Sequence, residues 1–171
     1  MAEPMKTTLI AGVLVMLFGA AGAGQMPNYK VTSKSDSHTD FSRLKTYAWE
    51  AGWLSYDRAT HERIVAAVDR ELGALGFTKG TPEACDVTVL YNVLRRTDVD
   101  VTVKARTAEG RPTYQVGSLV VLLRDPTSRK ELFRARADTP IELEPEKMAA
   151  IIDNQVAQMF ARYPARRSNH R

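Results

Sequence analysis

Residues 85–94 read C-D-V-T-V-L-Y-N-V-L and form the clearest strand pattern in this chain of 171 residues. Successive side chains of a strand point to opposite faces, so every second residue shares a face. One face would carry Cys85, Val87, Val89, Tyr91 and Val93. Because this face is almost wholly apolar, we expect it to be buried, and Cys85 with it.

The chain that follows alternates in the same way. We expect residues 95–98 to turn the chain and residues 99–105 to return as the second strand of a hairpin. Residues 107–113, which contain Gly110 and Pro112, are expected to form an exposed loop.

A second hairpin is predicted further along. Residues 114–124 form a long apolar strand, Asp-Pro-Thr-Ser at 125–128 supplies turn residues, and residues 131–137 return. Two shorter strands are expected near the start, over residues 29–35 at a sheet edge and over residues 45–49.

Residues 57–75 are predicted to form a helix. Its apolar stripe recurs at helical spacing and consists of Ile64, Val68, Leu72 and Leu75. Asp57 is placed to cap the N-terminus, and Gly76 stands where a left-handed glycine ends many helices.

Residues 145–163 are predicted to form a second helix. Pro145 suits the first helical position, and Pro164 ends the pattern. The apolar stripe consists of Met148, Ile152, Val156 and Met159. The predicted fold is therefore α+β: a single domain with an antiparallel sheet of five or six strands and two helices packed on one face.

The first residues read as a signal peptide. An apolar run at residues 7–20 follows Lys6 and precedes Ala21-Gly22-Ala23, which fits signal peptidase. We expect residues 1–23 to be removed near Ala23, leaving one domain at 24–164 and a basic, disordered tail at 165–171. No Cys near this site offers a lipid attachment point. The expected location is periplasmic or secreted, and the alternative is a membrane tether formed by an uncleaved N-terminal segment.

The formal net charge of +4 is concentrated at the end of the chain. Four arginines equal that excess: Arg162, Arg166, Arg167 and Arg171. The body is therefore close to neutral, which disfavours nucleic acid as a partner. The tail either contacts an anionic membrane surface peripherally or is simply solvated, and we favour the solvated tail.

The stretch F-S-R-L-K-T-Y-A-W at residues 41–49 resembles the F-S-x-x-K-T-Y-A-W opening signature of a bacterial envelope family, the domain of unknown function 4136. Three further segments are similar in order. They are the helix ending in L-x-x-x-G-F (64–77), the A-D-hydrophobic strand start with Cys85 inserted (84–87), and the penultimate hairpin (117–137). In that hairpin the family often has Trp where Phe133 and Arg134 stand.

The resemblance covers nearly the whole mature chain. It implies an exported α+β domain that is often lipid-anchored in relatives, and it implies no activity, because the family has none assigned. The missing lipid-attachment Cys is the departure from the family pattern.

Aromatic residues at 47, 49 and 53 raise the question of a binding platform. Tyr47 and Trp49 would share one strand face, where they either stack on a sugar or peptide or pack as core. We favour the core, because buried aromatic residues dominate core energetics. Trp53 lies beyond the strand and is expected to be more exposed.

Three catalytic or metal-binding hypotheses are weaker than their structural alternatives. His38 and Asp40 with His61-Glu62 supply too few ligands at metal-binding spacing. Cys85 is interpreted as a small buried hydrophobic residue and not as a nucleophile. Because it is the only cysteine, no intramolecular disulfide can form. Asp86 and Asp125 stand where aspartates bond turn backbones rather than act as an acid–base pair.

No nucleotide-binding or hydrolase motif occurs in the sequence. We therefore assign no catalytic, cofactor-binding or metal-binding residue and expect no cofactor. The expected role is a non-enzymatic binding or structural accessory module of the bacterial envelope, with an envelope protein, glycan or lipid as partner. The alternative is a hydrolase-like envelope enzyme with an unrecognised site.

Overall fold

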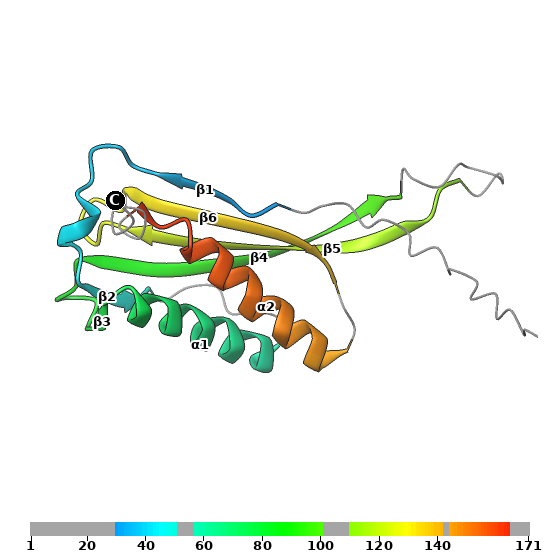
Figure 1. Ribbon diagram of the computed structural model, residues 1–171, viewed down its shortest axis with the longest axis horizontal. Helices are drawn as coiled ribbons and strands as arrows, with labels where there is room; N and C mark the ends of the chain where they lie inside the picture. Colours follow the sequence, from blue (N-terminus) through cyan, green and yellow to red (C-terminus); the bar gives the residue numbers. More distant parts are fainter. Residues whose placement is uncertain (1–29, 51–56, 101–109, 142–143, 165–171) are drawn as a thin grey trace, which may run out of the picture.

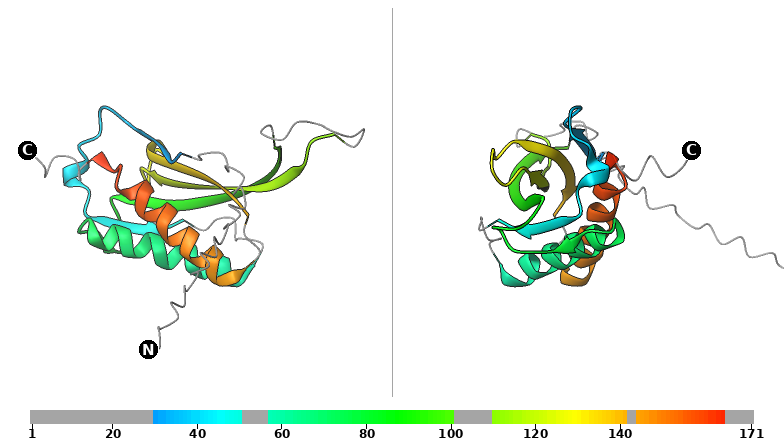
Figure 2. Two further views of the ribbon diagram at one scale, coloured as in Figure 1. Left: turned by 45° about the vertical axis from the view of Figure 1, so that its right-hand side comes forward. Right: turned by 90° about the vertical axis from the view of Figure 1, so that its left-hand side faces the viewer.

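The computed structural model describes residues 30–50, 57–100, 110–141 and 144–164. In this part of the chain, one six-stranded sheet carries both helices on the same face (Figures 1 and 2). The strands are β1 (Thr32–Ser35), β2 (Thr46–Trp49), β3 (Thr78–Lys79), β4 (Val87–Val99), β5 (Thr113–Arg124) and β6 (Glu131–Pro140). The helices are α1 (Arg58–Ala74) and α2 (Pro145–Phe160), with a 3-10 turn, η1, at Phe41–Arg43. The predicted α+β class is confirmed.

The strand order across the sheet is β1-β6-β5-β4-β2-β3. The pairs β1–β6, β6–β5 and β5–β4 are antiparallel. Of these, β5–β6 is the hairpin predicted from residues 114–124 and 131–137, whereas β4 pairs with β5 and not with the strand predicted at 99–105. β2 instead runs parallel to both β4 and β3. The crossover helix α1 explains this exception, because it returns the chain to the end of the sheet from which β2 started.

The turn predicted at residues 95–98 is wrong. β4 runs through these residues to Val99, and Arg95 pairs with Gly117 while Val99 pairs with Thr113. The polar run of residues 95–98 resembles a turn, but it holds no Gly or Pro, and its side chains are exposed or half-buried in the strand. Figure 1 shows this end of β4 and β5 projecting beyond the rest of the sheet. Most of the strand expected at 99–105 lies outside the described residues.

The caps of α1 form as predicted. The Asp57 side chain accepts a hydrogen bond from the Thr60 backbone N–H at 2.8 Å. Gly76 adopts φ of 85°, and the Phe77 and Gly76 N–H groups bond back to the Leu72 and Gly73 carbonyls at 3.0 and 2.9 Å. This is a Schellman ending, which uses glycine because a left-handed residue with a Cβ is strained.

The main core lies between the helices and the alternate residues of the central strands. Their fully buried members include Val87 and Val89 of β4, Val121 and Leu123 of β5, and Phe133 and Ala135 of β6. The helices contribute the predicted stripes, of which Ile64, Val68, Leu72, Ile152, Val156 and Met159 are buried. A smaller cluster of Leu90, Val120 and Leu122 has the opposite strand parity and lies on the face away from the helices.

Candidate functional site

Tyr47 and Trp49 act as an anchor between β2 and α1. Tyr47 Oη and Trp49 Nε1 both donate to one carboxylate oxygen of Asp69, each at 2.8 Å, and Lys79 Nζ lies 2.9 Å from the other oxygen. Tyr47 is buried, as predicted, and Trp49 is half-buried with its ring edge-on to Tyr91. Burial and the Asp69 hydrogen bond both raise the pKa of Tyr47. These two aromatic side chains link β2 to α1 through Asp69. Trp53 lies outside the described residues.

The histidines and aspartates considered for a metal site are not brought together. His38 is exposed, and Asp40 caps η1 by accepting hydrogen bonds from the Ser42 N–H and Oγ. His61 is instead paired with an aromatic residue, its Nδ1 lying 2.7 Å from Tyr91 Oη. Within the ranges that the structure describes, no three His, Cys, Asp or Glu side chains are grouped as metal ligands.

Asp86 and Asp125 each bond backbone N–H groups in separate turns. Asp86 accepts from the backbone N–H groups of Lys45 and Thr46 at 2.8 and 2.9 Å. Asp125 accepts from the N–H of Ser128 at 2.7 Å. These hydrogen bonds lower the pKa of both carboxyls, so they remain ionised and suit no acid–base exchange.

The predicted burial of Cys85 is wrong. The thiol is partly exposed, and its Sγ lies 3.7 Å from the Pro82 carbonyl. Strand parity does not extend to Cys85, because β4 begins only at Val87 and Asp86 turns toward β2. Partial burial still raises the pKa of the thiol, which disfavours the nucleophilic thiolate.

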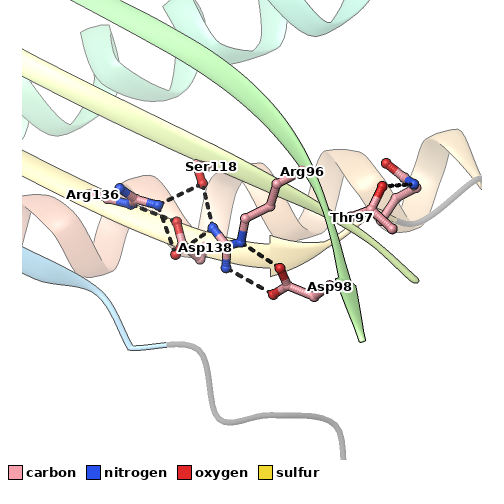
Figure 3. A network of polar contacts seen from close by, with 7 residues as sticks. Arg96, Thr97, Asp98, Ser118, Arg136 and Asp138 are labelled. Carbon is pink, nitrogen blue, oxygen red and sulfur yellow. Dashed lines mark hydrogen bonds and ion pairs between the residues drawn. The ribbon is translucent and has the colours of Figure 1, made fainter. Parts of the chain in front are cut away.

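A charged network that the sequence did not reveal lies on the face away from the helices (Figure 3). Arg96 of β4 and Arg136 of β6 each donate to the Oγ of buried Ser118, both at 3.1 Å. Asp98 and Asp138 accept paired hydrogen bonds from these guanidinium groups. Burial alone would raise the pKa of Asp138, but the bonds from Arg136, Ser118 and Arg96 hold it below its ordinary value. Two cations balance two anions in this network, which links β4, β5 and β6.

The strongest candidate for binding is a cavity of about 610 Å³ between the N-terminal halves of both helices and the middle of the sheet. We call it the helix–sheet cavity. Its volume lies within the roughly 300–1,000 Å³ of small-molecule sites. Its apolar walls are formed by Ile64, Val93, Leu119, Ala137, Ile141, Met148, Ile151 and Ile152. Several of these side chains are only partly buried, so apolar surface remains open to a ligand.

Gly117 leaves part of this space open. It lies on β5 with the parity of Leu119 and Val121, which face the helices. A Cβ at Gly117 would lie 3.5 Å from Ile141 Cγ1, an ordinary van der Waals distance. A larger side chain at this position would therefore enter the cavity.

The charged residues at the helix–sheet cavity are already balanced. Arg63 of α1 forms an ion pair with Asp153 of α2. Asp57 has a lowered pKa, mainly through hydrogen bonds from Thr60 and with a further contribution from the charge of Arg95. The walls thus offer apolar contact rather than an excess of charge.

A second, shallower recess of about 570 Å³ lies between β1 and the end of α2. Its described lining includes the cations Lys30 and Arg162 and the hydroxyls of Thr32, Ser33 and Ser35, without an acidic residue. The tail residues 165–171, where a membrane contact was considered, lie outside the described residues. Neither described helix is long and apolar enough to cross a bilayer.

Comparisons with known proteins identify a family and a fold. The family model whose description is "Domain of unknown function (DUF4136)" matches residues 31–165. A comparison with curated proteins gives no match.

Among solved structures, a PDZ domain protein from Parabacteroides distasonis is similar over 78% of this chain, with a TM-score of 0.53 and 13% identity. This chain spans only 35% of that structure. PelC from Paraburkholderia phytofirmans, a dodecamer, gives a TM-score of 0.48 and 12% identity over 78% of this chain and 98% of its own. A minor lipoprotein from Acinetobacter baumannii gives a TM-score of 0.40 and 13% identity over 72% of this chain and 93% of its own. At these identities the likeness concerns the fold alone.

Proposed function

Since the chain belongs to the DUF4136 family of domains of unknown function, we propose its role from the geometry of the helix–sheet cavity. The protein is a non-enzymatic binding module that holds the apolar part of a ligand in this cavity. The observation that carries the proposal is the open apolar wall described above. Each ligand methylene buried there contributes about 0.8 kcal/mol, so a flexible hydrocarbon chain is a suitable occupant.

Binding is favoured over catalysis by the chemistry of the cavity walls. Among the described lining residues, Asp57 is the only carboxylate, and its side chain is committed to capping α1. A general acid or base needs a pKa near the working pH, whereas the pKa of Asp57 is lowered.

The proposed setting is the bacterial cell envelope. The apolar run before Ala21-Gly22-Ala23 supports export, with cleavage near Ala23 and a periplasmic or secreted product. Mass spectrometry of the protein recovered from envelope and medium fractions tests this. A mass beginning at Gly24 is expected, whereas an intact N-terminal segment would support the tethered alternative.

Peripheral contact with an anionic membrane is a second proposal, supported by the recess that holds Lys30 and Arg162. Each cation near an anionic surface contributes about 1 kcal/mol. Lys30→Gln and Arg162→Gln should each lower binding to phosphatidylglycerol vesicles about fivefold, without changing binding to phosphatidylcholine vesicles. Arg111→Gln is the control of equal charge, because Arg111 is exposed and does not line the recess. Equal losses of phosphatidylglycerol binding in all three variants would indicate that binding depends on net charge alone and not on the recess.

The cavity itself is tested by filling it. Gly117→Ile places a β-branched side chain in a strand, where it is well tolerated, and directs it into the helix–sheet cavity. We expect the exported protein to bind a fluorescent analogue of tetradecanoate and the variant to lose at least tenfold in affinity while its melting temperature is retained.

Gly73→Ala serves as the control, because a Cβ at Gly73 of α1 meets no atom within 4 Å and this residue does not line the cavity. Unchanged binding by a folded Gly117→Ile variant would contradict the proposed site.

A further inference from the structure

The far end of β4 has a strand partner on one side only. On the other side, β2 pairs with β4 as far as Val89, whose carbonyl accepts from the Glu50 N–H at 2.9 Å. The backbone groups of successive strand residues alternate between the two sides, so Thr97 and Val99 direct theirs to the same side as Val89. Within the described ranges, no strand pairs with residues 95–99 on this side. We call these residues the β4 edge.

The alternation holds to the end of the strand. The pairing of β4 with β5 runs without a register shift to Val99, which lies opposite Thr113. The next residue, Asp100, directs its N–H to the β5 side, where it bonds the Pro112 carbonyl at 2.8 Å. Because this end of the two strands projects beyond the rest of the sheet (Figure 1), another strand can approach the β4 edge.

Exposed apolar side chains accompany this edge. Leu94 and Val99 are 55% and 49% exposed, and they are the two exposed large hydrophobic side chains among the described residues. A strand edge with backbone groups directed outward is a template for pairing with another chain, and apolar side chains beside it add area to be buried.

The order of charges along the β4 edge favours a second copy of the same chain. Arg95 and Arg96 come before Thr97, whereas Asp98 and Asp100 come after it. An antiparallel copy reads in reverse, so a pairing centred on Thr97 places Arg96 opposite Asp98 of the second copy, twice by symmetry. Opposite charges across two strands are stabilising. Arg96 already bonds Asp98 of its own chain at 2.9 Å, so the second copy extends an existing charge pair.

The neighbouring registers are less favourable. A centre at Arg96 places two guanidinium groups opposite each other, and a centre at Asp98 places two carboxylates opposite each other, both of which are destabilising. The centre at Thr97 instead pairs two threonines, a favourable cross-strand pair. It also places Val99 opposite Arg95, whose aliphatic stem can cover it.

We propose that the β4 edge joins two copies of this chain in a symmetric dimer, in which the two β4 strands pair antiparallel about Thr97. Both copies use the same edge, so the contact closes at two subunits. The two sheets become one continuous sheet across the contact. This pairing does not depend on a ligand in the helix–sheet cavity.

The first test measures the mass of the exported protein by sedimentation without ligand, at increasing protein concentration. We expect a mass twice that of the single chain. Val99→Lys places a cation opposite Arg95 of the second copy and should weaken the dimer about threefold or more, whereas Val99→Glu should strengthen it. These two variants are matched controls, because both replace the same exposed valine. A monomer at every concentration would overturn the dimer, and equal effects of Lys and Glu would overturn the register.

The second test uses disulfide formation between two copies, in a Cys85→Ser background that removes the only native thiol. Residues directly opposite in a hydrogen-bonded antiparallel pair have Cα atoms about 5.5 Å apart, within disulfide reach, so Thr97→Cys should cross-link under mild oxidation. Val99→Cys is the control, because the two copies of this position lie four residues apart along the strands, about 14 Å. Preferential cross-linking of Val99→Cys, or none in either variant, would contradict the proposed pairing.

Discussion

Arg96 on β4 and Asp138 on β6 form an ion pair, with 3.1 Å between Nη1 and Oδ2, although β5 lies between their strands. The pair spans the sheet because Ser118 of β5 is small and its Oγ accepts from the same guanidinium nitrogen. Three strands are therefore joined on the face that no described helix covers.

Asp138→Asn should destabilise the protein by about 1–3 kcal/mol near neutral pH, because it leaves two guanidinium groups without their shared acceptor charge. The folded pKa of Asp138 is lowered. Its stabilising contribution is therefore complete above about pH 3.9, the unfolded value, and is lost as the pH falls through the folded pKa. Urea melts of both proteins should differ most near neutral pH and converge in acid. A pH-independent gap would contradict the assignment, and Glu83→Gln, an exposed turn residue, is the control.

Asp69→Ala should cost about 1–3 kcal/mol for each partly buried donor that it leaves without an acceptor. Tyr47 Oη and Trp49 Nε1 would both lose their acceptor. Trp49→Phe keeps an aromatic ring and removes one donor, so it should cost less. Lys79→Met should change stability by about 1 kcal/mol or less, because the Lys79 side chain is 53% exposed. Denaturant melts rank these variants, and an equal effect for Asp69 and Lys79 would contradict the anchor.

Two glycines at the end of α1 should respond in opposite directions. Gly76→Ala should destabilise by about 1–2 kcal/mol, because φ of 85° strains a residue with a Cβ. Gly73→Ala should stabilise by about 1 kcal/mol, because it removes a flexible residue from the helix and its Cβ meets no atom within 4 Å. Thermal melts decide this, and the same sign for both changes would contradict the Schellman ending.

Cys85 should react with a thiol reagent in the native protein. Its partial exposure permits access, while its raised pKa keeps the thiolate fraction low at neutral pH. We expect labelling to be slower than in urea-unfolded protein and to accelerate as the pH rises. Complete protection of the native thiol would contradict this partial exposure and would support the buried position that strand parity predicts. Cys85→Ser should change stability by about 0.5 kcal/mol or less, as for a surface substitution.

Local patterns in the sequence predicted most of the elements. The α1 ends follow from Asp57 and Gly76, whose capping geometry depends only on nearby residues. The strand at residues 95–98 was missed because turn composition and an exposed, charged strand look alike. Cys85 was misplaced because alternation says nothing about where a strand begins. The residues that line the helix–sheet cavity could not be predicted from the sequence either, since Gly117 and Gln155 belong to no motif.

The sequence by itself determined the helices, the apolar faces of the long strands and the family resemblance, because periodicity, caps and signature residues lie within short stretches of chain. Only the tertiary structure decided the parallel pairing of β2, the link from Arg96 to Asp138, and the cavity that brings Gly117 of β5 near Ile141 and Gln155 of α2. These relationships depend on strand order and on how the helices cross the sheet. Both are settled by packing between residues that are distant in sequence, which no local pattern records.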